Sequence, residues 1–445
     1  GLNKIYLDLG ETKSIEDVLE LIKNETKKKK KGEWIIGRNW DQAHWKEQRY
    51  ITAEDLDPVS PEHPVFLRHV SGHLATVNSL GFKRLNLPTD MQGVDKDEKG
   101  KIIGTLRDID FSSIKELRPS FEQFVKGLEI GMNEAIKLGI TSIHDNITFE
   151  ILPAYKHLFY NNKLKIRVYG IIYEDMLDEI IKLGVKREHK DKWFRIGAVK
   201  LMTDGAISSR TAFLFDEYSD KKGEKGFALY DEQRLAEMVK KVHNAGLQIA
   251  AHAIGDRAIY NLIKAIQNNV PKNECKKALH RIEHAELIRK EDIKLAAKIG
   301  LVMSMQPNFV YRWGMVGVNS MYEQRLGKER TLLNNPFKWV LNSNILLCFG
   351  SDCMPMNPLY GIKGAIFHPN ENLRLSLEEA IRCYCYYPAV VSGEEKEKGT
   401  IEKGKLADLV ILSHNLDEIT LEEYEKVKVD YTIIGGRIEY KRKKE

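Results

Sequence analysis

The sequence contains few cysteines, and their spacing suggests neither a disulfide framework nor a zinc knuckle. Five cysteines occur in 445 residues, and none forms a CxxC pair. Cys383 and Cys385 are separated by one residue, a spacing that suits no common zinc module. A secreted disulfide scaffold is therefore excluded, and a reducing cytoplasm is the compartment we expect. The abundance of Lys, Glu and Ile is compatible with a thermophilic source.

Long apolar runs and a charge of one sign are also missing. No stretch of 18 apolar residues could span a bilayer, and no signal peptide is recognisable at Gly1. The 69 basic and 64 acidic residues leave a formal net charge of only +5. The one obvious basic run, residues 27–31, reads as a solvated helix end. We therefore expect a small-molecule substrate, with neither a membrane nor a nucleic acid as partner.

The chain does contain a series of short, β-branched apolar runs separated by helical patterns. Seven runs lie at 139–145, 165–172, 196–202, 247–252, 281–285, 301–306 and 345–352. Each is almost continuously apolar rather than alternating, as expected of parallel strands that are buried on both faces. Between two of them, residues 231–245 show helical spacing and are followed by Gly246, a typical residue after a helix end. This alternation predicts an α/β fold of the TIM (β/α)8 barrel type.

The runs divide the chain into three predicted regions. Residues 136–395 form the barrel and supply seven of the eight strands that a closed barrel needs. Residues 1–135 read as a large, mostly helical insertion that acts as a lid, with a strand near 64–70. Residues 396–445 carry strand patterns with glycine turns and predict a small β domain. A chain that is 42% hydrophobic can supply one large core and such an appendage.

Polar residues fall at the predicted carboxyl ends of several strands, where barrels of this kind place their active sites. In chain order these residues are His144, Asp145, Lys200, Asp204, His252, His284 and Asp352. Imidazole and carboxylate groups suit zinc and similar divalent ions. Each residue also has a structural interpretation: a strand-end histidine can be a core residue, Asp204 a turn former and Lys200 a rim residue. Their coincidence on several strands favours a metal site.

Segments spread over nearly the whole chain resemble the amidohydrolase superfamily, and within it the YtcJ-like branch, amidohydrolase family 3. The matching segments are GRNWDQ (37–42), SGHLATVNS (71–79), GITSIHD (139–145), VKLMTDGAISSRTA (199–212), HAIGDRA (252–258), RIEHA (281–285), SMQPNF (304–309), GSDCMP (350–355) and KGTIEKGKLADLVIL (398–412). Together these motifs are specific, although no single one of them would be.

The resemblance implies a role for four strand-end residues. Lys200 matches the lysine that can be carboxylated and bridge two metals, and His252 and His284 match the histidines after strands five and six. Asp352 matches the aspartate of strand eight, which binds metal and takes a proton from the attacking water. We therefore expect one or two divalent ions, with zinc as the first choice, and a carbamate on Lys200.

Other residues are expected to contact the substrate or to support the site. The predicted substrate contacts are Trp40, His73, Asp204 and Phe309, and further candidates to line the pocket are Asn78, Tyr311 and Trp313. Packing within the lid is the alternative for each of these side chains. Glu283 is expected on the side of its strand opposite His284, in a supporting role. Asp256 is expected to brace the loop after His252.

One feature of the superfamily is missing, because no His-x-His pair occurs among the thirteen histidines. In relatives this pair ends barrel strand 1, shortly before a segment like residues 4–10. We therefore expect this chain to begin just downstream of strand 1, so that residues 1–135 lie between strands 1 and 2. Residues 396–445 would then be the C-terminal half of a composite β-sandwich. The alternative is a paralogue that has lost its metal site; His144 lies on a different strand and is not expected to replace the pair.

The sequence thus predicts a metal-dependent hydrolase that cleaves a non-peptide C–N bond of the amide, N-acyl or N-formyl kind, with Asp352 as general base. Two alternatives stay open: a heterocycle deaminase on the same barrel, and a metal-less protein with a structural or interaction role. Lys200 in VKLMTDG favours the hydrolase over the deaminase. Retention of four site residues favours an enzyme over a scaffold. A homodimer is the assembly expected by default.

Overall fold

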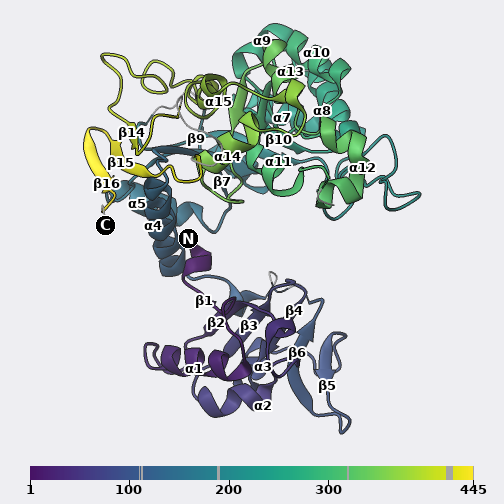
Figure 1. Ribbon diagram of the computed structural model, residues 1–445, viewed down its shortest axis with the longest axis vertical. Coiled ribbons are helices and arrows are strands. Elements are labelled where there is room, and N and C mark those ends of the chain that lie inside the picture. Colours follow the sequence, from purple (N-terminus) through teal and green to yellow (C-terminus); the bar gives the residue numbers. More distant parts are fainter. Residues whose placement is uncertain (110, 112–113, 188–190, 318–319, 417–423, 444–445) are drawn as a thin grey trace. The chain divides into compact units, whose positions relative to one another are not determined.

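The computed structural model describes residues 1–109, 111, 114–187, 191–317, 320–416 and 424–443 (Figure 1). These residues form two compact units, Gly1–Gly131 and Met132–Glu445. Helix α4 (Phe121–Lys137) contains the boundary between them. None of the helices in the described ranges is long and apolar enough to cross a bilayer.

The N-terminal unit is organised around a six-stranded mixed sheet, so the prediction of a mostly helical region is wrong. The strand order is β1 (Leu7–Asp8), β2 (Ile35–Trp40), β3 (Val65–His69), β4 (Leu74–Val77), β6 (Ile102–Arg107) and β5 (Val94–Lys96). The helices are α1 (Ile15–Thr26), α2 (Ala53–Leu56) and α3 (Ser79–Leu85). The predicted strand near 64–70 is confirmed as β3. Because most of these strands carry interspersed polar residues, their signal is weaker than the helical period of α1.

The second unit contains a seven-stranded parallel sheet, which confirms all seven predicted strands. In spatial order these are β13 (Leu347–Phe349), β12 (Val302–Met305), β11 (Arg281–His284), β10 (Gln248–Ala253), β9 (Phe194–Met202), β8 (Arg167–Tyr173) and β7 (Ser142–Ile147). Each strand pairs with the strand next to it in the sequence. Because crossovers are right-handed, a sequential order without reversal puts the connecting helices on one face, as in an α/β barrel.

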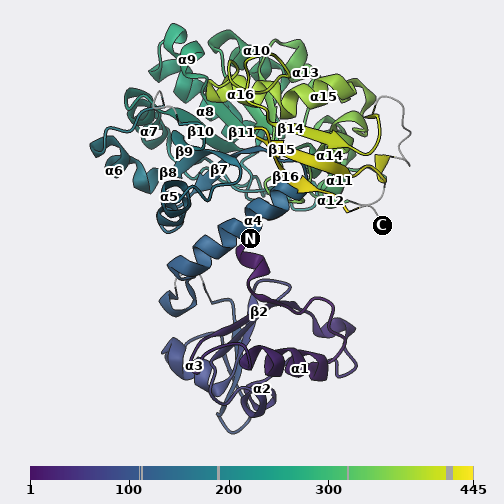
Figure 2. The ribbon, with the colours of Figure 1, turned by 90° about the vertical axis from the view of Figure 1, so that its left-hand side faces the viewer.

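Helices cover the outer face of this curled sheet, as Figures 1 and 2 show. The helices that follow β7 in the described part of this unit are α5 (Leu152–Tyr160), α6 (Leu177–Lys182), α7 (Glu232–Asn244), α8 (Asp256–Asn269), α9 (Lys272–Ala278), α10 (Lys290–Ile299), α11 (Pro307–Trp313), α12 (Met321–Leu333), α13 (Phe337–Asn342), α14 (Pro358–Ile366), α15 (Leu377–Tyr384) and α16 (Tyr386–Ser392). Helix α7 is the one predicted at 231–245: Asp231 caps its N-terminus, and Gly246 follows it with φ 72°.

The two faces of the sheet differ in chemistry, and this difference positions the candidate site. Val199, Leu201 and Ile249 belong to the main apolar core together with residues of the outer helices. Strand alternation turns Lys200 and His252 to the opposite, inner face. That inner face holds a small apolar layer around Tyr169 and, beyond it, buried polar side chains.

The C-terminal region of this unit forms a three-stranded antiparallel sheet, which confirms the predicted β pattern. Its strands are β14 (Leu409–Leu412), β15 (Val429–Ile434) and β16 (Arg437–Lys441). Gly435 and Gly436 connect the last two with φ 57° and 79°, a left-handed turn that glycine adopts without strain.

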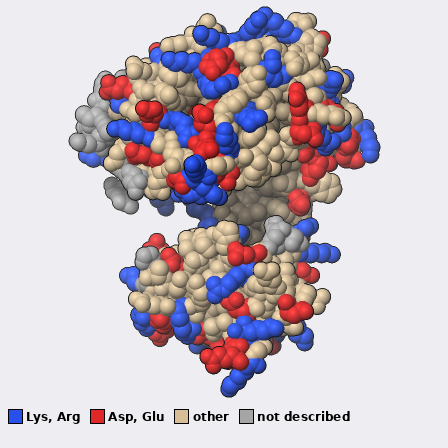
Figure 3. Space-filling view, turned by 90° about the vertical axis from the view of Figure 1, so that its right-hand side faces the viewer, with Lys and Arg blue, Asp and Glu red and all other residues tan. Residues whose placement is uncertain are grey.

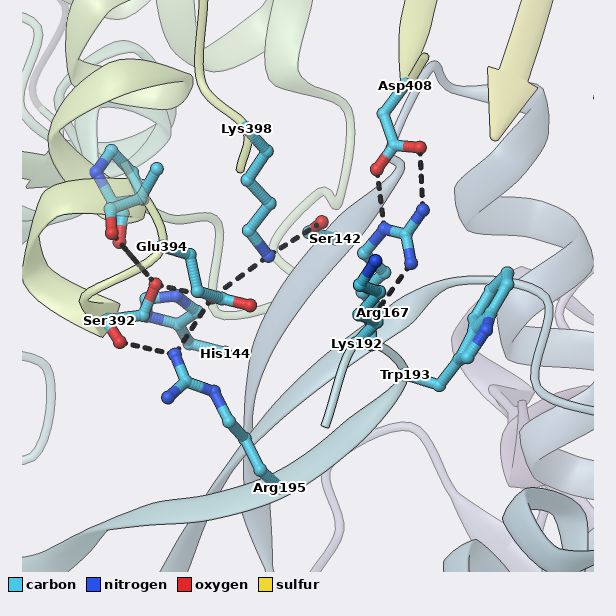
Figure 4. A network of polar contacts seen from close by, with 12 residues as sticks. Ser142, His144, Arg167, Lys192, Trp193, Arg195, Ser392, Glu394, Lys398 and Asp408 are labelled. Atoms are coloured by element: carbon cyan, nitrogen blue, oxygen red, sulfur yellow. Dashed lines mark hydrogen bonds and ion pairs between the residues drawn. The ribbon is translucent and has the colours of Figure 1, made fainter. Parts of the chain in front are cut away.

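Ion pairs hold this C-terminal region to the N-terminal ends of the barrel strands (Figure 4). Asp408 accepts two hydrogen bonds from Arg167, at 2.6 and 2.9 Å, and both side chains are at most 5% exposed. Glu394 lies 3.1 Å from Arg195 and 3.0 Å from Lys398. Elsewhere, acidic and basic side chains are interspersed on the face shown in Figure 3, in keeping with their near balance in the sequence.

Candidate functional site

Four side chains predicted as metal ligands come together at the carboxyl ends of the barrel strands. Lys200 lies near the end of β9, His252 near the end of β10, His284 at the end of β11 and Asp352 just after β13. The Lys200 ammonium interacts electrostatically with each of the other three groups. Lys200, His252 and His284 are less than 10% exposed. The structure therefore gathers these residues rather than scattering them.

The two imidazoles are adjacent and neutral, and a hydrogen bond orients the ring of His252. Their ring centroids lie 4.5 Å apart in an edge-to-face arrangement. Burial lowers the pKa of His252 to about 4 and lowers the pKa of His284 well below its ordinary value. His252 donates from Nε2 to the Gly205 carbonyl at 2.9 Å, which leaves Nδ1 as its lone-pair nitrogen. The Nδ1 atom of His284 is buried without a hydrogen-bond partner.

Left-handed backbone brings His284 and Asp352 to the site. His284 and the following Ala285 have φ of 75° and 49°, and Asp352 and Cys353 have φ of 48° and 57°. Non-glycine residues pay about 1–3 kcal/mol for such conformations, which cluster at functional sites. Regular strand alternation would turn His284 to the outer face, as it does Ile282 two residues earlier. The left-handed backbone interrupts this alternation, and His284 lies beside the inward-facing His252 instead.

Opposed charges surround Lys200 on the inner face. Burial lowers the pKa of the Lys200 amine, while the Glu283 and Asp352 carboxylates oppose that shift. Burial raises the pKa of Asp352, and the Lys200 ammonium opposes it. Glu283 lies 2.6 Å from the Nε atom of Arg281, two residues earlier on β11. Glu283 therefore lies on the inner face beside Lys200, and the left-handed backbone at His284 turns that ring to the same side, so the expectation that the two residues lie on opposite sides of the strand is wrong. The supporting role of Glu283 stays a prediction.

The first predicted strand extends further than expected, which changes the position of its polar residues. Strand β7 continues to Ile147, so His144 and Asp145 lie within the strand rather than at its end. His144 accepts a hydrogen bond from Arg281 at 2.8 Å. Tyr155 donates to Asp145 at 2.5 Å. These contacts place both residues in the packing of the sheet and agree with the expectation that His144 does not replace a missing ligand pair.

The donor set suits a divalent ion if Lys200 takes part in it. Neutral imidazole is a preferred ligand of zinc. The Nδ1 atom of His284 is buried without a hydrogen-bond partner, and a cation could bind to a lone pair on this nitrogen. Among the residues that the structure describes, no three His, Cys, Asp or Glu side chains gather in a way that could hold a metal ion. Catalytic zinc sites use three protein ligands, so His252 and His284 need Lys200, as an anionic carbamate, or a further donor beside them.

The predicted substrate contacts of the second unit have different environments. The ring of Phe309 stacks on His284 at 6.1 Å and packs against Trp313 at 4.9 Å. Tyr311 accepts a hydrogen bond from Lys363 at 2.6 Å. Phe309 is therefore next to a candidate ligand, and its contact with substrate stays a prediction, as do those of Tyr311 and Trp313.

Asp204 is not open to a substrate, which corrects the expectation for this residue. Its side chain is fully buried, and its two oxygens accept hydrogen bonds from three backbone N–H groups. Such a carboxylate has no accessible oxygen to offer a ligand. Asp256, by contrast, accepts from the N–H of Phe215 at 2.9 Å and so ties the loop after β9 to the start of α8. Its predicted role in bracing the loop after His252 stays a prediction.

Three predicted pocket residues lie in the N-terminal unit. Trp40 is fully buried, donates to the Leu67 carbonyl at 3.0 Å and stacks on Trp45. Asn78 is also buried and uses its amide to cap α3 and to hold neighbouring backbone. The observed contacts of both residues are therefore packing contacts within the N-terminal unit, which was the alternative to a substrate contact. His73 is exposed and lies 3.1 Å from Asp108, and its predicted substrate contact stays a prediction.

Some residues that shape the site gave no signal in the sequence. Arg281 is buried within a strand and links Glu283 to His144. Glu286 is buried and accepts a hydrogen bond from Tyr322 at 2.6 Å. The RIEHAE segment shows that charged residues flank His284, but the partners His144 and Tyr322 lie 137 and 36 residues away along the chain, and one sequence cannot identify them.

Comparisons with known proteins agree with this geometry. The profile described as Amidohydrolase family matches residues 2–440. The chain is 27% identical to the putative amidohydrolase YtcJ of Bacillus subtilis over 99% of this chain and 86% of that protein. It is 25% identical to the N-substituted formamide deformylase of Arthrobacter pascens over 96% of this chain and 83% of that protein. It also resembles the crystal structure of an uncharacterized metal-dependent hydrolase from Pyrococcus furiosus, with 27% identity, a TM-score of 0.77 and coverage of 91% and 82% of the two chains. The chain therefore belongs to the amidohydrolase family.

Proposed function

We propose that this protein is a metal-dependent hydrolase of a non-peptide C–N bond in an amide, N-acyl or N-formyl compound. The observation that carries the proposal is the pair of adjacent neutral imidazoles, His252 and His284, with a buried and unpartnered Nδ1 on His284. Lys200 and Asp352 interact electrostatically beside this pair. Zinc is the first candidate ion, because neutral imidazole and carboxylate-type oxygen are its common ligands.

His252 and His284 would hold the ion, together with Lys200 in its carbamate form. A neutral amine adds CO2 to give a carbamate and a proton, and burial lowers the pKa of Lys200 toward the neutral form that this reaction requires. The carbamate would replace a repelling ammonium with an anionic ligand. When bound, a divalent ion supplies Lewis acidity that makes water nucleophilic at neutral pH.

Asp352 is positioned to move the proton that hydrolysis requires. Water adds its oxygen to the carbonyl carbon, the C–N bond breaks, and the nitrogen leaves as an amine that has gained a proton. The Asp352 carboxylate takes that proton from water and delivers it to the departing nitrogen, acting first as base and then as acid. Burial raises the pKa of Asp352, which brings it closer to the range where a carboxylate both accepts and returns a proton.

The relatives support a C–N bond as the target. An N-substituted formamide deformylase is 25% identical to this chain over most of both proteins. We therefore propose N-formyl and N-acyl amines as the first substrate class to test. Phe309, stacked on His284, is the side chain next to the site that would contact an apolar substituent of such a substrate.

A substrate panel with matched readouts tests the proposal. The purified protein is loaded with Zn²⁺, its metal content is measured, and it is assayed with N-formyl and N-acyl amines for release of acid and amine. Nucleobases and related heterocycles are assayed in parallel for release of ammonia. We expect acid release that is lost in the Asp352→Asn variant. Ammonia release alone would favour a deaminase, and a protein that binds no zinc and turns over neither class would be the metal-less alternative.

A further inference from the structure

Three consecutive residues after β9 hold His252 and the loop that follows it. The Thr203 hydroxyl donates to the His252 carbonyl at 2.6 Å, and the Thr203 N–H donates to the same carbonyl at 3.0 Å. The Gly205 carbonyl accepts from Nε2 of the His252 ring at 2.9 Å. Asp204, between them, binds the loop itself. The segment therefore contacts both the backbone and the ring of one candidate ligand.

We call residues 203–205 and their contacts with residues 252–255 the clamp, and the Asp204 carboxylate is its centre. One oxygen accepts from the N–H of Ile254 at 3.1 Å and lies 3.4 Å from Nε2 of His252. The other accepts from the N–H groups of Phe213 and Gly255, each at 2.9 Å. Ile254 and Gly255 follow His252 by two and three residues, so both oxygens fix the backbone immediately after the ligand. Asp204 itself is fully buried, which removes competition from water.

We propose that Asp204 is a positioning residue that fixes the place and the tautomer of the His252 ring. A carbonyl can only accept, so the Gly205 contact requires hydrogen on Nε2 and leaves Nδ1 to bind an ion. That contact holds only while residues 203–205 keep their register with residues 252–255, and Asp204 supplies three of the hydrogen bonds that keep it. That the His252 ring binds an ion rests on the proposed function. That its tautomer is fixed rests only on the hydrogen bond to Gly205.

A second, partly buried carboxylate in the same region provides a control. Asp256 also accepts from a backbone N–H of the loop after β9, that of Phe215 at 2.9 Å. Its other backbone contact is the N–H of Arg257, beyond the segment that Asp204 holds. Loss of Asp256 should therefore loosen the loop without releasing His252, whereas loss of Asp204 should do both.

The test compares Asp204→Asn with Asp256→Asn in the full chain, using two readouts. Because both oxygens of Asp204 accept from N–H groups, either orientation of an asparagine amide places its NH2 against a backbone donor. The first readout is the tautomer of His252, from long-range ¹H–¹⁵N correlations of ¹⁵N-histidine protein, with His252→Gln to assign the signal. The second is Co²⁺ affinity from its visible absorption. We expect a single Nε2–H tautomer in the wild type and in Asp256→Asn.

In Asp204→Asn we expect a mixture of tautomers and a Co²⁺ affinity about 10–100-fold weaker, the usual loss when a group that orients a ligand is removed. Equal effects in the two variants, or none in Asp204→Asn, would overturn the proposal. A wild type that binds no Co²⁺ but shows the expected tautomers would refute the proposed metal function and leave the role of Asp204 standing.

A milder pair of variants guards against failure of Asp204→Asn to fold. Thr203→Val removes the hydroxyl that donates to the His252 carbonyl and keeps the side-chain shape, whereas Thr203→Ser keeps the hydroxyl. We expect Thr203→Val to shift the tautomer and weaken Co²⁺ binding in the same direction as Asp204→Asn, and Thr203→Ser to restore both. If Thr203→Val behaves as the wild type, the clamp does not position His252.

Discussion

Removal of one charge from the buried Arg167–Asp408 pair is expected to destabilise the second unit strongly. Asp408→Asn leaves the Arg167 guanidinium, 4% exposed, without its counter-charge. Two charge-assisted hydrogen bonds are weakened, while the Gly435 N–H, 2.8 Å from Asp408, can still donate to the amide oxygen. Breaking a buried ion pair from one side costs about 3–5 kcal/mol. We expect a loss of that size in the free energy of unfolding.

The Asp430–Arg442 pair is the matched control, because it lies in the C-terminal sheet region at the same 2.6 Å separation but is more exposed, 17% and 34%. Asp430→Asn should cost less than about 1 kcal/mol. Urea unfolding followed by circular dichroism measures both variants. In a double variant, Arg167→Met added to Asp408→Asn should recover part of the loss, since it removes the unpaired charge. The reasoning fails if Asp408→Asn costs no more than Asp430→Asn.

Three further predictions concern the site and its surroundings. Asp352→Asn should keep bound metal and lower turnover by about 10²–10⁴-fold, the usual effect of removing a general base; metal analysis and single-turnover rates check this, and retained activity would assign the proton transfer to another group. Chelation of the zinc-loaded protein should abolish activity and Zn²⁺ should restore it, whereas activity that survives complete metal removal would contradict the proposed chemistry. Burial raises the pKa of Glu286 to about 7 in the folded protein from its ordinary 4.5, so folding favours the protonated form and stability falls as pH rises from 4.5 to 7. Glu286→Gln should therefore flatten the pH dependence of unfolding and stabilise the protein above pH 7 by up to about 3 kcal/mol, which urea unfolding at pH 5 and 8 would measure; unchanged pH dependence would argue against a buried ionisation at this residue.

The sequence was most informative where a local pattern repeats. The seven parallel strands were predicted because each is a short, continuous apolar run, a pattern that burial on both faces imposes. Helix α7 was predicted with its cap residues, because Asp231 and Gly246 act on the backbone next to them. In the N-terminal unit the same reasoning found only β3, since the other strands there carry interspersed polar residues and show no continuous apolar run.

The sequence alone determined which residues could form the site, because strand ends in a parallel sheet meet at one edge whatever the distant packing. It placed Lys200, His252, His284 and Asp352 there, and the structure gathers them. Only the tertiary structure decided how each is held. A left-handed turn, absent from any strand pattern, brings His284 beside His252. Asp204, expected to face a substrate, instead binds a loop about 50 residues away, because the donors that surround a buried carboxylate come from whichever chain segments fold against it.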